Sequence, residues 1–422
     1  MSVAVEPALS GRPDGEITAR PRRPRAVDPP TGRWVGVNWR YRHTVLVLCM
    51  GAFFVTYFAR LAISPVVPLI VADLAVSNTV IGVALSGMWL AYGLSQFPSG
   101  ILADRFGERR VILLAVGGTT VMSVLLAFAP VFPVFVLAAV LLGLLAGLHY
   151  AVATTLLSRT FSDVGTAVGI HTAGGPLAGL VAPTIAAWIG VRYGWRPAIA
   201  VSAIVGVPVL LAFAWRVRPT EPRRPDQRMR ERFRVGPLVE LVTRPELLAP
   251  LLVAMAGTYV VQGLMSFLPT FLVEFREYTT ATAGVVFSAF FLVRTGAQVV
   301  IGRLSDRLSR DAAIALAMGA GCLGTISFVA GPGAVGVAGG VLLAGFGSSF
   351  FSAIDSRFMD ALGDAERGAG FGLVRTTYTV VGAAGSVGVG LAADLFGWAI
   401  AVWILAGLFG LALLIVVIDH GR

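Results

Sequence analysis

Twelve apolar segments, most of them about 20 residues long or longer, account for most of this chain and constrain its fold more than any other feature. A helix needs about 20 mostly apolar residues to cross the hydrocarbon core of a bilayer. The sequence therefore predicts an all-α polytopic membrane protein with twelve transmembrane helices. The expected segments are 43–71, 79–103, 111–129, 133–157, 165–190, 197–217, 249–274, 281–302, 312–330, 333–356, 369–392 and 398–418.

Composition supports a membrane class. Of the 422 residues, 56% are hydrophobic and only 13% are charged, whereas a soluble domain carries about a quarter charged residues. Both cysteines, Cys49 and Cys322, lie in apolar runs, which argues against a disulfide framework. No metal-ligand spacing is visible, and we expect neither a metal nor a cofactor.

The polar stretches divide the chain into five parts. Residues 1–42 are rich in Arg and Pro and lack an apolar core, so they predict a disordered cytoplasmic tail rather than a signal peptide. The tail could also bind anionic lipid headgroups; nucleic-acid binding is disfavoured because nothing folded accompanies the charge. We expect a six-helix half at 43–217, a cytoplasmic linker at 218–248, a second six-helix half at 249–418 and a short tail at 419–422.

Arginine placement predicts the orientation. All 33 basic residues are arginines. With the N-terminus inside, only Arg192, Arg196 and Arg276 fall in outside turns, while Arg60, Arg294 and Arg375 fall deep within segments. This asymmetry follows the positive-inside rule. We therefore expect a multi-pass protein of the cell membrane with both termini in the cytoplasm.

An internal repeat relates the two halves. A shift of 202 positions superimposes an ungapped run that includes glutamine, glycine, leucine, aspartate and arginine. The matched residues are Gln96, Gly100, Leu102, Asp104 and Arg105 with Gln298, Gly302, Leu304, Asp306 and Arg307. Two parallel six-helix repeats predict alternating access to a site between the halves, near the middle of the bilayer.

The turn between the second and third segments resembles a motif of the major facilitator superfamily. The pattern G-x-x-x-D-R-x-G-x-R-R is matched at Gly100, Asp104, Arg105, Gly107, Arg109 and Arg110, with a degenerate second copy at Asp306 and Arg307. By this resemblance the motif residues gate the cytoplasmic side through charge pairs that re-form during transport. Alternatively, they serve only as topology anchors.

Arg60 is the main candidate for substrate binding, because charged groups inside the membrane are costly and are commonly functional. The repeat places Tyr259 and Gln262 opposite Tyr57 and Arg60. A guanidinium binds a carboxylate or phosphate through two parallel hydrogen bonds. The Tyr-x-x-Arg pattern resembles the organic-anion and organophosphate branches of the superfamily. A buried ion pair and snorkelling to the outer surface are alternatives for Arg60, and Arg294 could be a second substrate contact or a structural partner of Asp355.

Three residues could carry a coupling proton: His149, His171 and Asp355. Histidine titrates near neutral pH, but it is also an ordinary helix-packing residue. Two departures from family patterns matter. The arginine that drug–proton exporters carry in the fourth helix is missing, and so is the glutamate of many organic-anion symporters near Ala146.

Together these features predict a secondary transporter for a small organic anion, such as a carboxylate, a sugar acid or a phosphorylated compound, with proton-coupled transport expected. The alternative is a proton-coupled multidrug exporter. An enzyme or receptor is disfavoured because the sequence shows no nucleophile–base pair, metal cluster or phosphate-binding loop. We expect a monomer in the lipid bilayer whose partners are an anionic small molecule and possible coupling protons, without nucleic acid.

Overall fold

The computed structural model describes residues 41–223, 244–363 and 367–420. In these ranges every regular element is helical. All of them belong to one unit, Arg40–Arg422. Eleven helices or short helix pairs are long and apolar enough to cross a membrane, and the bent helix α3 completes twelve. The prediction of an all-helical membrane protein with twelve spans is confirmed.

The first repeat contains six spans, several of which are broken. Its elements are α1 (Tyr41–Leu61), η1 (Ser64–Val66), α2 (Val67–Leu74), α3 (Asn78–Phe106), α4 (Glu108–Ala127), α5 (Phe132–Gly147), α6 (His149–Thr160), α7 (Val164–Thr172), α8 (Gly174–Tyr193) and α9 (Trp195–Arg216). The pairs α5–α6 and α7–α8 each form one span with a break in the middle. Helix α3 bends by 51° before Pro98, as expected where proline removes a backbone hydrogen bond.

The second repeat has the same order with fewer breaks. Its elements are α11 (Pro245–Glu274), α12 (Thr280–Arg307), α13 (Arg310–Ala330), α14 (Gly333–Gly347), α15 (Phe351–Ala361), α16 (Arg367–Phe396) and α17 (Trp398–His420). The predicted tail and most of the predicted linker lie outside the described residues. The five-part division of the chain therefore stays a prediction.

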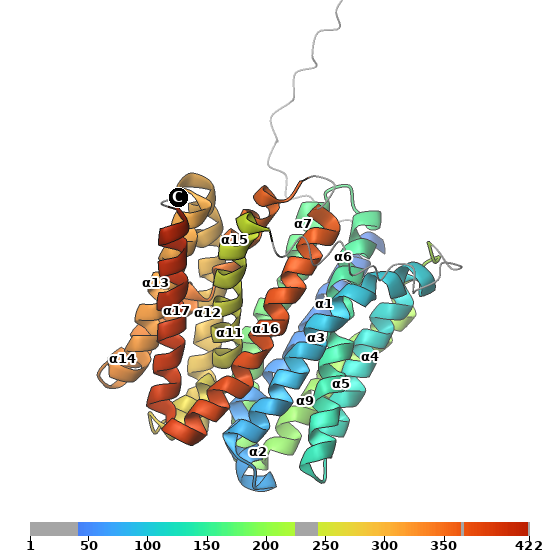
Figure 1. Ribbon diagram of the computed structural model, residues 1–422. Helices are drawn as coiled ribbons and strands as arrows, with labels where there is room; N and C mark the ends of the chain where they lie inside the picture. Colours follow the sequence, from blue (N-terminus) through green and yellow to red (C-terminus); the bar gives the residue numbers. More distant parts are fainter. Residues whose placement is uncertain (1–40, 224–243, 364–366, 421–422) are drawn as a thin grey trace, which may run out of the picture. The chain divides into compact units, whose positions relative to one another are not determined.

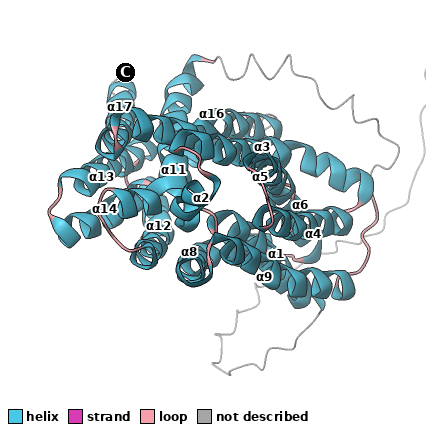
Figure 2. Cartoon of the chain, turned by 90° about the horizontal axis from the view of Figure 1, so that it is seen from below, coloured by secondary structure: helices cyan, strands magenta, loops and turns pink. Residues whose placement is uncertain are grey.

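The helices lie side by side, and two helix pairs join the repeats (Figures 1 and 2). Helix α3 packs along α16, and α8 packs along α12. We call the end that carries the turn at Gly107 and the C-terminus of α17 the motif end; it is uppermost in Figure 1. The end that carries α2 is the opposite end.

Turns at the opposite end show the pseudo-symmetry in atomic detail. Gly194 and Gly397 have positive φ angles of 86° and 85°, a backbone conformation that favours glycine. The tryptophan after each of them makes the same bond. Trp195 Nε1 donates to Asp73 Oδ2 at 3.1 Å, and Trp398 Nε1 donates to the Glu274 carboxylate at 2.7 Å.

The two repeats are bonded to each other at the opposite end. The Ser64 hydroxyl donates to the Ser266 carbonyl at 2.8 Å, and the hydroxyls of Thr184 and Ser288 lie 2.8 Å apart. Between α3 and α16, the backbone N–H of Val387 donates to the Ser86 hydroxyl. These contacts link the repeats at this end. We name this set of bonds the seal.

Candidate functional site

Two connected cavities lie between the repeats, above the seal. The deep cavity, of about 290 Å³, is lined by residues of α1, α3, α6, α11, α12, α15 and α16. The vestibule, of about 750 Å³, shares Tyr57, Tyr92 and Arg294 with it. The vestibule reaches Gly165, in the first turn of α7, and Val299, near the end of α12, both of which are exposed. The cavities therefore extend toward the motif end.

Arg60 lies in the wall of the deep cavity and is only 2% exposed. Its Nε donates to the Thr56 carbonyl one turn earlier in α1 at 3.1 Å. Its two terminal nitrogens, Nη1 and Nη2, have no hydrogen-bond partner. Buried polar groups are nearly always hydrogen-bonded, so this guanidinium presents two vacant donors. They have the geometry that a carboxylate or phosphate accepts.

Three aromatic rings hold the Arg60 guanidinium in place. Its central carbon lies 3.9 Å from the ring centre of Tyr92, 4.7 Å from that of Tyr57 and 5.1 Å from that of Trp89. Ring faces attract a cation without accepting its N–H groups in the plane. The rings therefore stabilise the charge without taking up the hydrogen-bonding positions of the terminal nitrogens.

The deep cavity contains further unsatisfied polar groups. The Gln262 Oε1 and the Thr258 hydroxyl, both from α11, are buried without hydrogen-bond partners. The structure thus brings Gln262 and Arg60 to the same cavity, as the repeat predicted. Tyr259 is placed elsewhere: its hydroxyl points at Gly388, where an added Cβ would lie 1.6 Å away. It packs between α11 and α16, outside the set of lining residues.

Positive charge predominates in the deep cavity. Arg60, Arg294 and Arg375 line it together with one carboxylate, that of Asp355. The Tyr378 hydroxyl donates to Asp355 at 3.1 Å. This arrangement favours an anionic ligand over a cationic one, because a cation would meet three like charges.

Arg294 and Arg375 occupy the boundary between the cavities. Arg294 donates to the Ser348 carbonyl at 3.3 Å and lies under Phe351 and Phe291. Arg375 lies 5.7 Å from the ring of Tyr150, which belongs to the other repeat. Tyr150 and Arg375 line both cavities and also a third, lateral cavity. A ligand moving from the vestibule to Arg60 passes these side chains.

The motif residues of the first repeat are held mainly within that repeat. Gly107 has a φ of 86°, and a Cβ there would lie 2.4 Å from the Thr220 carbonyl, so the turn requires glycine. Arg109 donates to the carbonyls of Val217 and Ala214 at 2.7 and 2.6 Å. It thereby satisfies carbonyls at the C-terminal end of α9.

The other motif residues lie nearby at the same end. Asp104 is half-buried and has a partner, the Arg105 guanidinium lies 5.4 Å from the Phe106 ring centre, and Arg110 is exposed. A Cβ added at Gly100 would have no atom within 4 Å. The switching role predicted for the motif stays a prediction.

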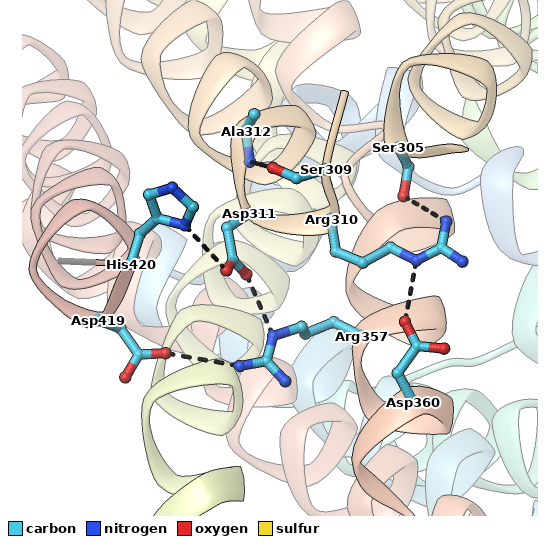
Figure 3. A network of polar contacts seen from close by, with 9 residues as sticks. All are labelled: Ser305, Ser309, Arg310, Asp311, Ala312, Arg357, Asp360, Asp419 and His420. Atoms are coloured by element: carbon cyan, nitrogen blue, oxygen red, sulfur yellow. Dashed lines mark hydrogen bonds and ion pairs between the residues drawn. The ribbon is translucent and has the colours of Figure 1, made fainter. Parts of the chain in front are cut away.

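The second copy of the motif contacts, through Asp306, a polar network at the motif end of the second repeat. Figure 3 draws the part of this network around Arg310 and Arg357. Arg310 pairs with Asp306 at 2.5 Å and with Asp360 at 3.0 Å. Arg357 pairs with Asp311 at 3.1 Å. Arg307 is exposed.

The first repeat contains a counterpart of the Arg357–Asp311 pair that the sequence analysis missed. Arg159 of α6 lies 2.9 Å from Glu108, which is 2% exposed in the first turn of α4. Each pair joins the start of the repeat's third span to the end of its fourth span. The sequence contained a signal for this pair. A shift of 203 positions superimposes Trp195 on Trp398, and the same shift superimposes Glu108 on Asp311.

The two predicted histidines are buried together behind the wall of the vestibule. His149 and His171 are both 0% exposed, and their ring centres lie 5.3 Å apart. Phe53 of α1, which lines the vestibule, contacts both rings. The third proton candidate, Asp355, lies in the deep cavity.

Trp89 and Tyr378 are cavity residues that the sequence analysis did not name. Trp89 could have been found from its position in the sequence. It lies three residues before Tyr92, and residues three apart lie on the same face of a helix. Tyr378 likewise follows Arg375 three positions later.

Comparison with known proteins decides the family. The model of the Major Facilitator Superfamily matches residues 49–347 and, again, 282–420. The chain belongs to the major facilitator superfamily. Membership agrees with the predicted resemblance and with the expectation of a transporter family rather than an enzyme family.

Relatives within the superfamily have different named roles. The chain is 27% identical over 182 residues to the membrane sensor protein UhpC of Escherichia coli (strain K12), covering 43% of this chain and 41% of UhpC. It is 23% identical over 251 residues to the hexuronate transporter of Bacillus subtilis (strain 168), covering 57% and 59%. Against the multidrug resistance protein MdtG of Citrobacter koseri, identity is 27% and coverage 72% and 76%. The chain spans about half the length of the first curated relatives it matches.

Solved structures of the superfamily share the fold. The nucleoside transporter NupG superimposes with a TM-score of 0.76 at 13% identity, covering 91% of this chain and 100% of NupG. A bacterial homologue of the human lysosomal transporter Spinster, in an inward-facing and unoccupied conformation, gives a TM-score of 0.74 at 16% identity, covering 91% and 96%.

Proposed function

We propose that this protein is a secondary transporter that moves a small organic anion across the cell membrane by alternating access. The observation that carries the proposal is Arg60, a buried cation whose Nη1 and Nη2 have no partner. An anion with two oxygens on one atom would satisfy both nitrogens. Gln262 and Thr258 would bind its hydroxyl groups, and Arg294 and Arg375 would add positive charge along the route.

The names of several relatives support an anionic substrate. They include a hexuronate transporter, a probable sulfoacetate transporter and probable hexose phosphate transport proteins. Sugar acids, sulfonates and sugar phosphates all carry a planar or tetrahedral oxyanion. We infer a substrate of that chemistry, with a carboxylate, sulfonate or phosphate group bound at Arg60.

We place the motif end and both chain termini in the cytoplasm, on the asymmetry of arginines between the two ends. The sealed opposite end would then face outward, and the structure would represent a conformation that exchanges substrate with the cytoplasm. We further propose that an imported anion enters together with protons.

A thermal-stability screen of the purified protein tests this function. A ligand that binds the native state raises the melting temperature with its concentration. We expect stabilisation by at least one of D-glucuronate, sulfoacetate and glucose 6-phosphate, and none by cationic dyes. Stabilisation by cationic dyes alone would contradict an anion site.

The second candidate function is export of drugs, and the extent of the match to MdtG favours it. The deep cavity argues against cationic drugs, because three arginines face one carboxylate. Drug-sensitivity profiles of cells with and without the gene separate the two functions. Increased sensitivity of the deletion strain to several unrelated drugs would favour export.

A further inference from the structure

His149 and His171 are the polar residues in the membrane region that ordinary packing explains least. Both are fully buried, and all four of their ring nitrogens lack a hydrogen-bond partner. A neutral imidazole has one N–H donor and one acceptor nitrogen. Leaving such groups buried and unpaired costs free energy, and buried polar groups without partners are rare. An arrangement of this kind needs an explanation.

The two rings occupy the breaks of two consecutive spans. His149 is the first residue of α6, directly after the α5–α6 break, and His171 is next to last in α7, before the α7–α8 break. At the shift of 203 positions, the second repeat has Ser352 where the first has His149, and Val374 where it has His171. Helix α16, the counterpart of the broken pair α7–α8, is continuous. The histidine pair is therefore specific to the first repeat.

Two groups beside the pair can interact with one added proton. The Phe53 ring stacks on His149 at 5.9 Å and contacts His171 at 5.2 Å, and an aromatic face attracts a cation. The carbonyl of Cys49 faces both rings without meeting hydrogen-bond geometry. It is an acceptor available to an additional N–H. With one proton shared between the rings, one imidazolium can donate to the neighbouring neutral ring.

The pair is close to the vestibule but does not line it. Thr172 and Ala173, which follow His171, line the vestibule, as do Phe53 and Tyr150. The Tyr150 ring lies 6.0 Å from His171. A proton from the vestibule therefore needs to pass only this single layer of side chains.

The groups around the pair carry few charges. On α1 the titratable group is the Tyr57 phenol, on α6 it is the Tyr150 phenol, and across the vestibule it is Arg375 of α16. Within the described ranges, neither ring is within ion-pair distance of a carboxylate. A protonated pair would consequently lack a fixed counter-charge. An anion in the neighbouring cavities would supply it.

We propose that His149 and His171 form one proton-binding site that takes up a single shared proton when an anion occupies the deep cavity. The link runs along one face of α1, from Phe53 beside the histidines to Tyr57 and then to Arg60. Because coupling between two binding events is reciprocal, the proton strengthens anion binding and the anion strengthens proton binding. This inference rests on the proposed anion transport and names the residues that would make it proton-dependent.

The first test needs no substitution and compares the protein with and without D-glucuronate. The chain contains four histidines, so selective ¹⁵N labelling of histidine gives a spectrum that NMR can follow in detergent from pH 8 to pH 5. With D-glucuronate bound, we expect the two buried rings to change together, with one proton taken up by both. If both buried rings keep the neutral signature down to pH 5 with D-glucuronate bound, the proton site does not exist.

The second test uses D-glucuronate as the probe and measures its Kd against pH. With one coupled proton, affinity should rise by up to about tenfold for each unit of falling pH. His149→Gln, His171→Gln and the double variant should all abolish that dependence equally, because a shared site fails when either ring is lost. His43→Gln and His420→Gln are the matched controls and should retain it. Wild-type pH dependence in the double variant would overturn the proposal.

The outcomes separate this inference from the proposed function. If two rings titrate together but neither D-glucuronate nor glucose 6-phosphate binds, the proton site stands and the anion site fails. If D-glucuronate binds with the same Kd at every pH, the anion site stands and the coupling fails. A variant that loses both binding and thermal stability is replaced by His171→Asn, for which the same loss of pH dependence is expected.

Discussion

At the scale of single residues, the proposed anion site depends on one arginine, Arg60, whose nitrogens have different surroundings. Aromatic faces cover the plane of the Arg60 guanidinium, and the carbonyl of Thr56 occupies its Nε. The two terminal nitrogens are left without partners. A side chain held in this way has little freedom to lose on binding, which favours affinity.

Arg60→Ala should abolish binding of D-glucuronate, and Arg60→Lys should only partly restore it. Losing one partner of a buried charge pair costs about 2–5 kcal/mol, which corresponds to a Kd at least about 30-fold higher. Lysine keeps the charge but lacks the two-pronged geometry. Isothermal titration calorimetry measures the Kd of both variants. Arg192→Ala, at the opposite end beside Trp188, is the control and should bind normally; an unchanged Kd in Arg60→Ala would remove the basis of the anion site.

Tyr92→Leu should weaken anion binding more than Tyr92→Phe. The Tyr92 ring centre is the nearest of the three to the guanidinium carbon, at 3.9 Å, and a cation–π contact contributes about 0.5–2 kcal/mol. Leucine removes the ring face, whereas phenylalanine retains it. We expect a Kd about 2- to 30-fold higher for Tyr92→Leu. Equal effects of the two variants would show that the hydroxyl, and not the ring face, matters.

At the scale of elements, the helix pairs that join the repeats are packed closely at one end and loosely at the other, as the space around their glycines shows. At the opposite end, a Cβ at Gly82 of α3 would lie 2.8 Å from the Ser386 carbonyl, and one at Gly284 of α12 would lie 2.4 Å from the Ala187 Cβ. At the motif end, Gly100 and Gly302 of the same helices have nothing within 4 Å. Small residues allow close helix packing where the helices meet.

Gly284→Ala should destabilise this conformation, whereas Gly302→Ala should leave it unchanged. The methyl group at position 284 clashes with backbone and side-chain atoms of α8, and overpacking costs about 1–3 kcal/mol. The melting temperature in detergent should fall by several degrees for the first variant only. A comparable fall for Gly302→Ala would mean that the motif end is also packed tightly in the resting protein.

At the scale of the whole molecule, the structure combines a sealed end with a cavity that extends to the other end. The seal is made of hydroxyl and backbone hydrogen bonds. Such bonds have modest net strength individually, about 0.5–1.5 kcal/mol each. A seal of this kind can break and re-form during a transport cycle, which fits alternating access.

A disulfide across the seal should lock the protein and stop transport. The hydroxyls of Thr184 and Ser288 lie 2.8 Å apart and belong to different repeats, so Thr184→Cys with Ser288→Cys should cross-link on oxidation. The control is Ser266→Cys with Ser386→Cys, whose hydroxyls lie 2.6 Å apart within the second repeat. Uptake of labelled D-glucuronate into proteoliposomes should fail for the first pair alone and return on reduction. Uptake by the oxidised seal variant would contradict alternating access through this interface.

The fold class, the number of spans and the family could all be predicted from the sequence. They follow from segment length, from the repeat and from the motif around Gly107, which are local or periodic properties of the chain. The pairing of Arg60 with Gln262 was also predictable, because the repeat superimposes α1 on α11. The same repeat argument misplaced Tyr259, since a shared register does not fix which way a ring turns.

The surroundings of each polar side chain, in contrast, depend on tertiary packing. Trp89, Tyr92 and Tyr57 come from two different helices, and their meeting around Arg60 depends on how α1 packs against α3. His149 and His171 are 22 positions apart, and their contact behind Phe53 depends on two helix breaks. Burial and missing hydrogen-bond partners are properties of packing, so no sequence pattern could have shown which of these groups is left without a partner.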